Sequence, residues 1–379
     1  MNLKIYLILL EALLICSCRN AQPLSDTVGH IIVEIANAEK TSFLSLMDEI
    51  EIIPLETVDA SVFGRVHTLR TDSRHIFIAD DQTGSVLIFD AAGKYVHSIS
   101  SIGNGPHEYL RIDDMGIHPE TGHIVIFDAM QRKLLEYTET GQCAAQNKLP
   151  FDGVFLKFSR LNNSRLVFDR TMPHTDKALQ YSVFIFNEDF RCIAKLFPYD
   201  TPLSFSVSPR QPFQIMHSQL FYLPMFSQTV YRIGEDAECM PVYTYDFGKH
   251  NMDRAYFASY RFEDPIKLTN DLKNGQSIYF FNVSMSDSQL FADFKYGELS
   301  CFHIYDLEHK SQKLFCDAYL DDCGSTLVPL TSSGDKFVSL VTSEQLNDII
   351  RMDSRFDSYK PDEYDNPALI KYKFKTLPE

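Results

Sequence analysis

The sequence predicts an all-β fold, a six-bladed β-propeller, from an internal repeat and from the grouping of its hydrophobic runs. Ile76–Asp80 returns as Ile124–Asp128, and Val86–Asp90 is followed at the same offset of 48 residues by Leu134–Tyr137. The repeat contains no insertion. Two hydrophobic strands around a polar turn, with a period of ~40–50 residues, are typical of a propeller blade. A β-sandwich, the competing all-β fold, predicts no gapless repeat of this kind.

The hydrophobic runs after the repeat fill four more units. These units cover residues 156–197, 213–248, 277–316 and 327–374. The last unit shows only three strands, and Glu49–Thr57 is a strand without a unit. We therefore predict that this N-terminal strand completes the last blade and closes the ring, because an open sheet edge invites aggregation. Residues 249–276 have helical rather than alternating spacing, which predicts a partly helical insertion between blades.

Composition excludes some classes of function. The chain has 379 residues and a formal net charge of −16, with 45% hydrophobic residues. An acidic chain lacks the basic surface that nucleic-acid binding needs, so we expect no nucleic-acid partner. The chain has no Trp, which argues against a dedicated lectin.

The N-terminus is typical of an exported protein. Lys4 precedes a short apolar run, Ile5–Ile15, which is too short to span a membrane and suits a signal peptide. The run ends in a lipobox-like Leu-Ile-Cys-Ser-Cys in which Cys18 is the expected lipidation site, although ordinary cleavage near Ala21 is the alternative. The expected organisation is a signal peptide at 1–18, a tether at 19–40 and the propeller at 41–379.

Several motifs in this order resemble the six-bladed β-propeller lipoproteins of Bacteroidetes, which are related to NHL-repeat and TolB-like propellers. The motifs are the lipobox, Ile53–Thr57, Gly103–Tyr109, Tyr231–Ile233 with Asp246–Gly248, and Asn366–Leu369. The resemblance implies a component of the cell envelope that accompanies nutrient uptake. Acidic residues do not follow Cys18 directly, which departs from the surface-export pattern and favours the periplasmic side of the outer membrane.

The most distinctive loop lies between the two repeats. We expect it to cross from one blade to the next, with Glu108 and Tyr109 fixing its shape, or alternatively to contact a ligand. It is no nucleotide-binding loop, because a strand and not a helix follows it. The residues of this candidate site are Gly103, Gly105, Pro106, Glu108 and Tyr109, with Arg111, Asp113 and Asp114 as neighbours.

We expect three aromatic residues of the predicted insertion, Tyr256, Tyr260 and Phe262, to pack against the propeller or, as the alternative, to form a partner-binding surface. Scattered cysteines are usually small buried hydrophobic residues, but Cys316 and Cys323 are near enough in sequence to form a disulfide. No pattern predicts a catalytic residue, a cofactor or a metal ligand set, and a calcium ion in the channel stays open. Asp80 and Asp128 recur with the repeat, which indicates turn-forming roles.

These observations favour a lipid-anchored binding or scaffold protein without catalytic activity. Its expected partners are the membrane, through the Cys18 lipid, and an envelope protein or transporter, with a small carbohydrate or peptide as ligand. The alternative is a propeller hydrolase or lyase that acts on carbohydrate or peptide through carboxylates at the channel mouth, with or without a metal.

Overall fold

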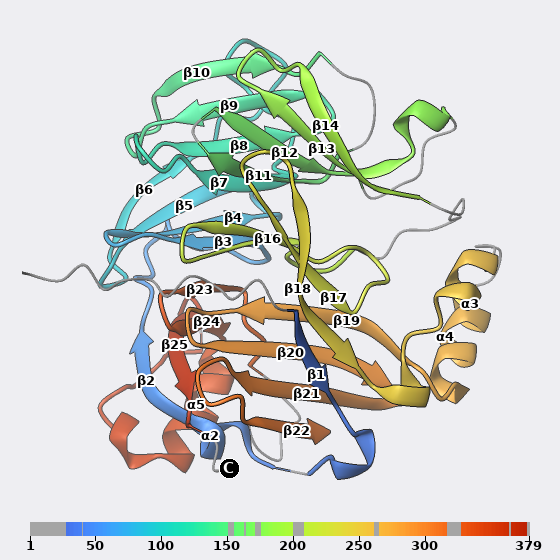
Figure 1. Ribbon diagram of the computed structural model, residues 1–379. Coiled ribbons are helices and arrows are strands. Elements are labelled where there is room, and N and C mark those ends of the chain that lie inside the picture. Colours follow the sequence, from blue (N-terminus) through green and yellow to red (C-terminus); the bar gives the residue numbers. More distant parts are fainter. Residues whose placement is uncertain are drawn as a thin grey trace, which may run out of the picture.

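Six sheets, five of four strands and one of five, are arranged around one axis in the computed structural model (Figure 1). The described residues are 28–39, 41–150, 155–162, 164–170, 176–199, 208–260, 265–316, 327–363 and 365–376. Contacts link the innermost strands of successive blades and return from the last blade to the first. The predicted six-bladed β-propeller is therefore confirmed. Cys18 lies outside the described residues.

The first three blades follow the predicted repeat and the third unit. They are β3–β6 (Val66–Thr71, His75–Asp80, Ser85–Asp90, Tyr95–Ile99), β7–β10 (Asp114–Ile117, Ile124–Asp128, Lys133–Tyr137, Cys143–Lys148) and β11–β14 (Lys157–Asn162, Arg165–Asp169, Tyr181–Asn187, Cys192–Pro198). In each blade the strands lie in chain order from the axis outward. The inner strands are therefore β3, β7 and β11.

The last three blades include the ring closure. They are β15–β18 (Phe213–Met216, Gln219–Tyr222, Thr229–Ile233, Cys239–Asp246), β19–β22 (Ile278–Met285, Gln289–Tyr296, Leu299–Asp306, Gln312–Cys316) and β23–β25 with β2 (Thr331–Ser333, Lys336–Val341, Ala368–Phe374, Met47–Ile53). The outermost strand of the sixth blade is β2, which pairs antiparallel with β25. An N-terminal strand thus completes the last blade, as the sequence predicts.

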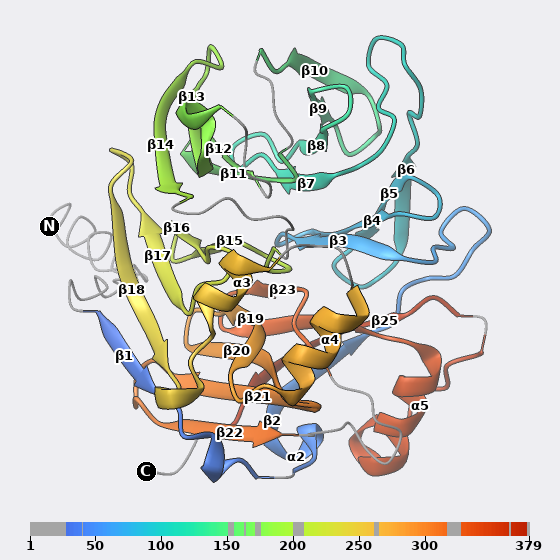
Figure 2. The same cartoon turned by 90° about the vertical axis from the view of Figure 1, so that its right-hand side faces the viewer.

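Short helices connect the sheets. They are η1 (Ile35–Asn37), α2 (Phe43–Leu46), η2 (Lys177–Leu179), η3 (Gly248–His250), α3 (Arg254–Ser259), α4 (Pro265–Asn274), α5 (Ser343–Met352) and η4 (Ser354–Phe356). A capping box begins α5, because Thr342 and Gln345 each bond the other's backbone N–H. Helices α3 and α4 precede β19 and lie on the face where the inner strands begin (Figure 2).

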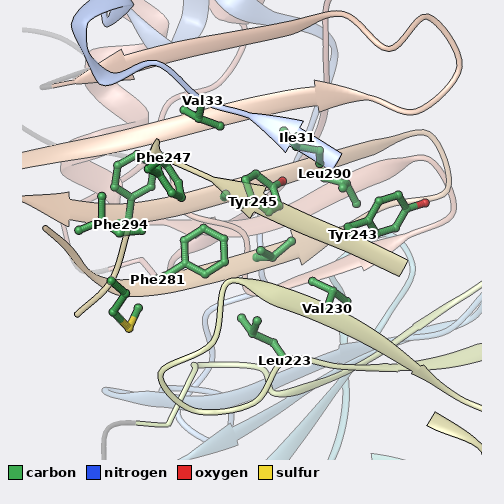
Figure 3. Close-up of a cluster of buried hydrophobic side chains, with 14 of the residues drawn as sticks. Ile31, Val33, Leu223, Val230, Tyr243, Tyr245, Phe247, Phe281, Leu290 and Phe294 are labelled. Carbon is green, nitrogen blue, oxygen red and sulfur yellow. The ribbon is translucent and has the colours of Figure 1, made fainter. Parts of the chain in front are cut away.

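Residues 28–39 are part of the fold, which corrects for these residues the expectation of a tether at 19–40. β1 (Gly29–Ile32) adds a fifth, parallel strand to the fourth blade by pairing with β18, and Glu39 then bridges to Phe315 on the outer strand of the fifth blade. Ile31 and Val33 are buried against the cluster between these blades (Figure 3). Burial alternates along this extended segment, with Ile31 and Val33 buried and Ile32 exposed, because successive side chains of a strand point to opposite faces.

The disulfide also differs from the predicted one. Cys316 is bonded to Cys301, and Cys323 lies outside the described residues. Cys301 and Cys316 face each other across the β21–β22 pair, with Cα atoms 4.1 Å apart. Cross-strand register, rather than closeness in sequence, brings these two sulfurs together.

Candidate functional site

Charged side chains from several inner strands gather in one place. His67 and Arg70 come from β3, Asp114 opens β7 and Lys157 opens β11. With Arg210, which precedes β15, they line a cavity of about 190 Å³. We call this cavity the charged chamber. Because its walls come from inner strands of different blades, the fold places it in the central channel.

Asp114 is a buried carboxylate between two cations. Arg70 Nη2 and Lys157 Nζ each lie 3.6 Å from Asp114 Oδ1, and the backbone N–H of Phe158 donates a 3.0 Å hydrogen bond to Oδ2. Asp114 Oδ1 has no hydrogen-bond partner among the described residues. Hydrogen bonds between charged groups are usually about 2.7–2.9 Å long. The two cations therefore balance the buried charge while keeping donors that Asp114 does not use.

His67 is held in one tautomer by its surroundings. His67 Nε2 lies 2.8 Å from the backbone oxygen of Asp113, which can only accept, so Nε2 carries a proton. His67 Nδ1 faces Asp81 at 3.5 Å. Lys157 Nζ is 3.5 Å from Nε2, but both groups are donors, so this contact is no hydrogen bond.

Arg210 forms an ion pair with Asp293 of the fifth blade. Asn282 donates a further 3.2 Å hydrogen bond from Nδ2 to Asp293 Oδ2. Burial raises the pKa of Asp293, and the Arg210 guanidinium opposes that rise. Arg210 is thus tied to its own carboxylate, in contrast to Arg70 and Lys157, which share one.

A larger cavity of about 530 Å³ adjoins the charged chamber, and we call it the polar chamber. The two cavities share Arg70, Phe158, Gln211 and Phe213 as walls. The polar chamber extends toward the far ends of the inner strands, and its other lining residues include Thr71, Ile117, Ser159, Arg160, Asn162, Ile215, Ser218, Gln219, Glu235 and Ser332. This volume is within the ordinary range for a small-molecule site.

Several polar atoms in the walls of the two chambers make no hydrogen bond to the described residues. Buried side-chain atoms without a hydrogen-bond partner among the described residues include one each from Thr68, Thr71, Asp114, Arg160 and Gln219. All five residues line one of the two chambers. Buried polar groups in folded proteins are nearly always paired, with water where protein is lacking. Their concentration along the channel indicates a wet, polar site.

The predicted Gly103–Tyr109 loop has a structural role. Glu108 Oε2 accepts a 2.7 Å hydrogen bond from the Gly105 N–H, and a Cβ on Gly103 would lie 2.1 Å from that oxygen. The buried Tyr109 hydroxyl donates to the backbone oxygens of Gly84 and Ile99 at 2.9 and 3.1 Å. The loop therefore fixes the crossing between the first and second blades.

The other loop residues are also held from outside. Lys133 Nζ donates 3.0 Å hydrogen bonds to the backbone oxygens of both Gly105 and Glu108. Pro106 is exposed. Among the neighbouring residues, Arg111 is paired with Asp113, and Asp114 alone lines the charged chamber. The structure thus brings one of the eight predicted residues into the channel site.

The recurring aspartates close turns. Asp80 accepts hydrogen bonds from the N–H groups of Arg65 (2.7 Å) and Thr83 (2.9 Å), and Asp128 accepts one from Leu110 (2.7 Å). Burial alone would raise the pKa of Asp80, but the hydrogen bonds from Thr83 and Arg65 outweigh it and lower that pKa. The repeat therefore marks structural carboxylates, as the sequence predicts.

The aromatic residues of the insertion pack against the propeller. Tyr260 is buried, which agrees with packing against the propeller rather than with a partner-binding surface, and Phe262 lies outside the described residues. Tyr256 is half-buried, and its hydroxyl donates a 3.0 Å hydrogen bond to Asp271 on α4. Phe257 stacks on Phe226 with ring centroids 4.4 Å apart. These contacts occur because α3 presents its apolar side to the fourth and fifth blades.

Sequence analysis missed Arg70, Lys157 and Arg210. Their only signal is a single cation at the edge of, or inside, an inner-strand segment, and such a residue is common on any strand.

Among the described residues no group of three or more His, Cys, Asp and Glu side chains could hold a metal ion. In the same part of the chain, no helix has the length and apolar character needed to cross a membrane.

Six blades around a polar axial channel define a β-propeller, and comparison with known proteins gives the family. The chain belongs to the family described as 6-bladed beta-propeller (DUF5128), whose profile matches residues 19–340. No curated protein matches the chain by sequence.

Solved structures show the same fold. An exported protein of Bacteroides fragilis superposes with a TM-score of 0.78 at 17% identity, covering 92% of this chain and 100% of its own. A member of the DUF4221 family from Bacteroides vulgatus has a TM-score of 0.53 at 10% identity, covering 87% and 97%. Virginiamycin B lyase of Staphylococcus aureus reaches only 0.38 at 10% identity, covering 72% and 75%, and carries no argument about activity.

Proposed function

We propose that this protein is an exported binding protein of the bacterial cell envelope, anchored by a lipid on Cys18, that holds a small ligand in its central channel. The observation that carries the proposal is the pair of adjoining chambers, of about 190 and 530 Å³, with unpaired polar atoms in their walls. The likeness in fold to an exported Bacteroides protein and the lipobox support the location. Association with nutrient uptake, on the periplasmic side of the outer membrane, is part of this proposal.

The rim of the polar chamber favours a binding role. It combines apolar side chains such as Ile117 and Ile215 with polar ones such as Asn162 and Glu235. Ile215 is 59% exposed, which is unusual for a large apolar residue on an inner strand. A mixed rim of this kind provides apolar contact and orienting hydrogen bonds, as small-molecule sites do.

A hydrolase or lyase is the second candidate, because Lys157 lies near the Asp114 carboxylate and His67 lines the same chamber. The His67 Nε2–H group, however, donates its hydrogen bond to the Asp113 backbone oxygen, and Nδ1 faces Asp81. A general base must reach the proton that it removes. The imidazole nitrogens both point at groups of the protein, which favours binding over catalysis.

The test fills the polar chamber with a bulky side chain. Ser159 is half-buried and lines the polar chamber, so Ser159→Phe places a ring inside it. Ser98→Phe is the matched control on the outer strand β6, where Ser98 is also half-buried. Each lipidated protein is purified from its native envelope in mild detergent, and bound small molecules and proteins are identified by mass spectrometry after denaturation.

We expect a saccharide or peptide from the wild type and from Ser98→Phe, and its loss from Ser159→Phe. Equal recovery from all three proteins, or recovery of no small molecule from any, would contradict ligand binding in the channel. A chemically altered ligand after incubation would favour the enzyme. Cys18→Ser should leave the protein outside the membrane fraction, and unchanged membrane association would contradict the lipid anchor.

A further inference from the structure

We propose that the channel ligand is an acidic saccharide, whose carboxylate binds Arg70 and Lys157 in the charged chamber and whose hydroxyls occupy the polar chamber. The inference rests on the proposed function, because it names the ligand class for the same channel.

The first argument is a reversal of charge. The whole chain carries −16, but the two chambers are lined by four cationic and two anionic side chains. The cations are Arg70, Lys157, Arg160 and Arg210, and the anions are Asp114 and Glu235. A basic channel in an acidic protein attracts anions locally, because cavity walls of low dielectric focus the field.

The second argument is the unequal pairing of the cations. Arg210 has Asp293 as its partner, and Arg160 Nη2 lies 3.1 Å from Glu136 Oε1. Arg70 and Lys157, by contrast, share Asp114 at 3.6 Å each. The buried Asp169 also interacts with Lys157, but burial raises its pKa to about 7, so it balances only part of the remaining positive charge.

The donors of this pair are also incompletely used. Arg70 Nη1 donates to the Leu69 carbonyl at 3.0 Å, and Lys157 Nζ reaches the Asp113 carbonyl at 3.4 Å. A guanidinium has five N–H donors and an ammonium three. The side chains are 28% and 20% exposed, so both are partly shielded from water while remaining open to the cavity. A ligand carboxylate would gain charge-assisted hydrogen bonds from both.

The polar chamber then favours a saccharide over a lipid. Its neutral polar lining consists of side-chain amides and hydroxyls, including Thr71, Ser159, Asn162, Gln211, Ser218 and Gln219. Such groups both donate and accept, as sugar hydroxyls do. The half-exposed Phe213 ring and the exposed Ile215 supply a small apolar surface. This combination matches a ring with hydroxyls at its edge better than a lipid chain, which would need apolar walls.

The test compares an acid with its own ester by isothermal titration calorimetry. The probes are galacturonic, glucuronic and N-acetylneuraminic acids, digalacturonic acid, and the methyl ester of each. Galactose 6-phosphate and an acidic dipeptide are the competing anions. Masking the carboxylate changes the charge but leaves the hydroxyls, so we expect at least one acid to bind and its ester to bind about tenfold more weakly or worse. Affinity for the acid should also fall with added salt.

The variants separate binding from folding. Arg70→Gln alone leaves the buried Asp114 with one cation, so the double variant Arg70→Gln/Asp114→Asn keeps the net charge of the site unchanged and removes the guanidinium donors. It should bind the acid about tenfold more weakly. Arg191→Gln, on the exposed turn before β14, is the matched control and should bind within about twofold of the wild type. Equal thermal unfolding of the free proteins verifies that each variant is folded.

Equal binding of an acid and its ester would overturn the inference, and so would wild-type affinity in the double variant. Tighter binding of the sugar phosphate or the dipeptide would also overturn it. If neutral sugars or peptides bind and Ser159→Phe abolishes that binding, the proposed function stands and this inference fails. If no probe binds and no small molecule is recovered from the native protein, both fail.

Discussion

The N-terminal strand offers the sharpest test of the fold, because two adjacent isoleucines have opposite environments. Ile31 is 1% exposed and faces the cluster between the fourth and fifth blades, whereas Ile32 is 62% exposed. Truncation of each to alanine removes the same atoms from neighbouring positions of β1. The cost in strand propensity is therefore similar, and the difference between the two variants isolates burial.

The expected magnitude follows from this burial. Removal of a buried isoleucine side chain to alanine costs about 2–5 kcal/mol, part of it for the cavity left behind. β1 is at the edge of its sheet, where neighbours such as Tyr243 and Val33 can relax into the space. We therefore expect Ile31→Ala to lower the free energy of unfolding by about 2–3 kcal/mol. Ile32→Ala should change it by less than about 0.5 kcal/mol, as surface substitutions usually do.

The assay is urea unfolding followed by intrinsic tyrosine fluorescence, with hydrogen exchange of the β1 and β18 amides as a second measurement. Exchange distinguishes local detachment of β1 from global unfolding, since detachment exposes only the amides of this edge. Equal free energies of unfolding for the two variants would refute the reasoning, as would β1 amides that exchange at the rate of an open loop.

Three further predictions concern single groups. Burial raises the pKa of Asp169 to about 7, so the folded state holds its proton more tightly than the unfolded state. That contribution to stability is fully present below pH ~4 and is lost as pH rises toward 7. The free energy of unfolding of Asp169→Asn, measured in urea, should therefore fall less between pH 5 and pH 8 than that of the wild type. Equal losses in the two proteins would contradict this prediction. Cys316→Ser opens the disulfide, which joins cysteines 15 residues apart, and should lower the free energy of unfolding by about 2–3 kcal/mol. The control Cys192→Ser changes an exposed free cysteine and should have little effect. Equal melting temperatures for the two variants would exclude a stabilising role for the disulfide. Tyr109→Phe removes the buried hydroxyl that bonds two backbone oxygens and should lower the free energy of unfolding by about 1–3 kcal/mol. The control Tyr95→Phe on β6 should lower it by less than about 0.5 kcal/mol. Similar losses for both variants would contradict the role assigned to the Tyr109 hydroxyl.

Much of the fold could be predicted because each blade strand carries its own signal. The unit predicted at 327–374, for example, contains the strands Lys336–Val341 and Ala368–Phe374. The ring closure could be predicted because one blade lacked a strand. Gly29–Ile32 could not, because four residues are too few to show periodicity and the strand depends on a partner far along the chain. The disulfide failed for a similar reason, since its pairing depends on sheet register.

The channel site could not be predicted, because repeat patterns reveal what blades share. Asp80 and Asp128 occupy equivalent positions, and both carboxylates close turns. Each blade must make the same turns, so the residues that recur are those that build it. A binding site at the axis requires residues that differ between blades, because six identical inner strands would line the channel with the same side chains on every side.

The strand registers show this divergence directly. Arg70 pairs with Phe77, whose counterpart 48 residues later, Val125, pairs with Gly116. The cation of the first blade thus corresponds to a glycine of the second, which lacks a side chain and leaves space in the polar chamber. By the same register Asp114 corresponds to Thr68. Inner-strand positions where the blades differ are therefore where ligand specificity can arise, and variants at those positions should change binding with less effect on folding than variants of the shared aspartates.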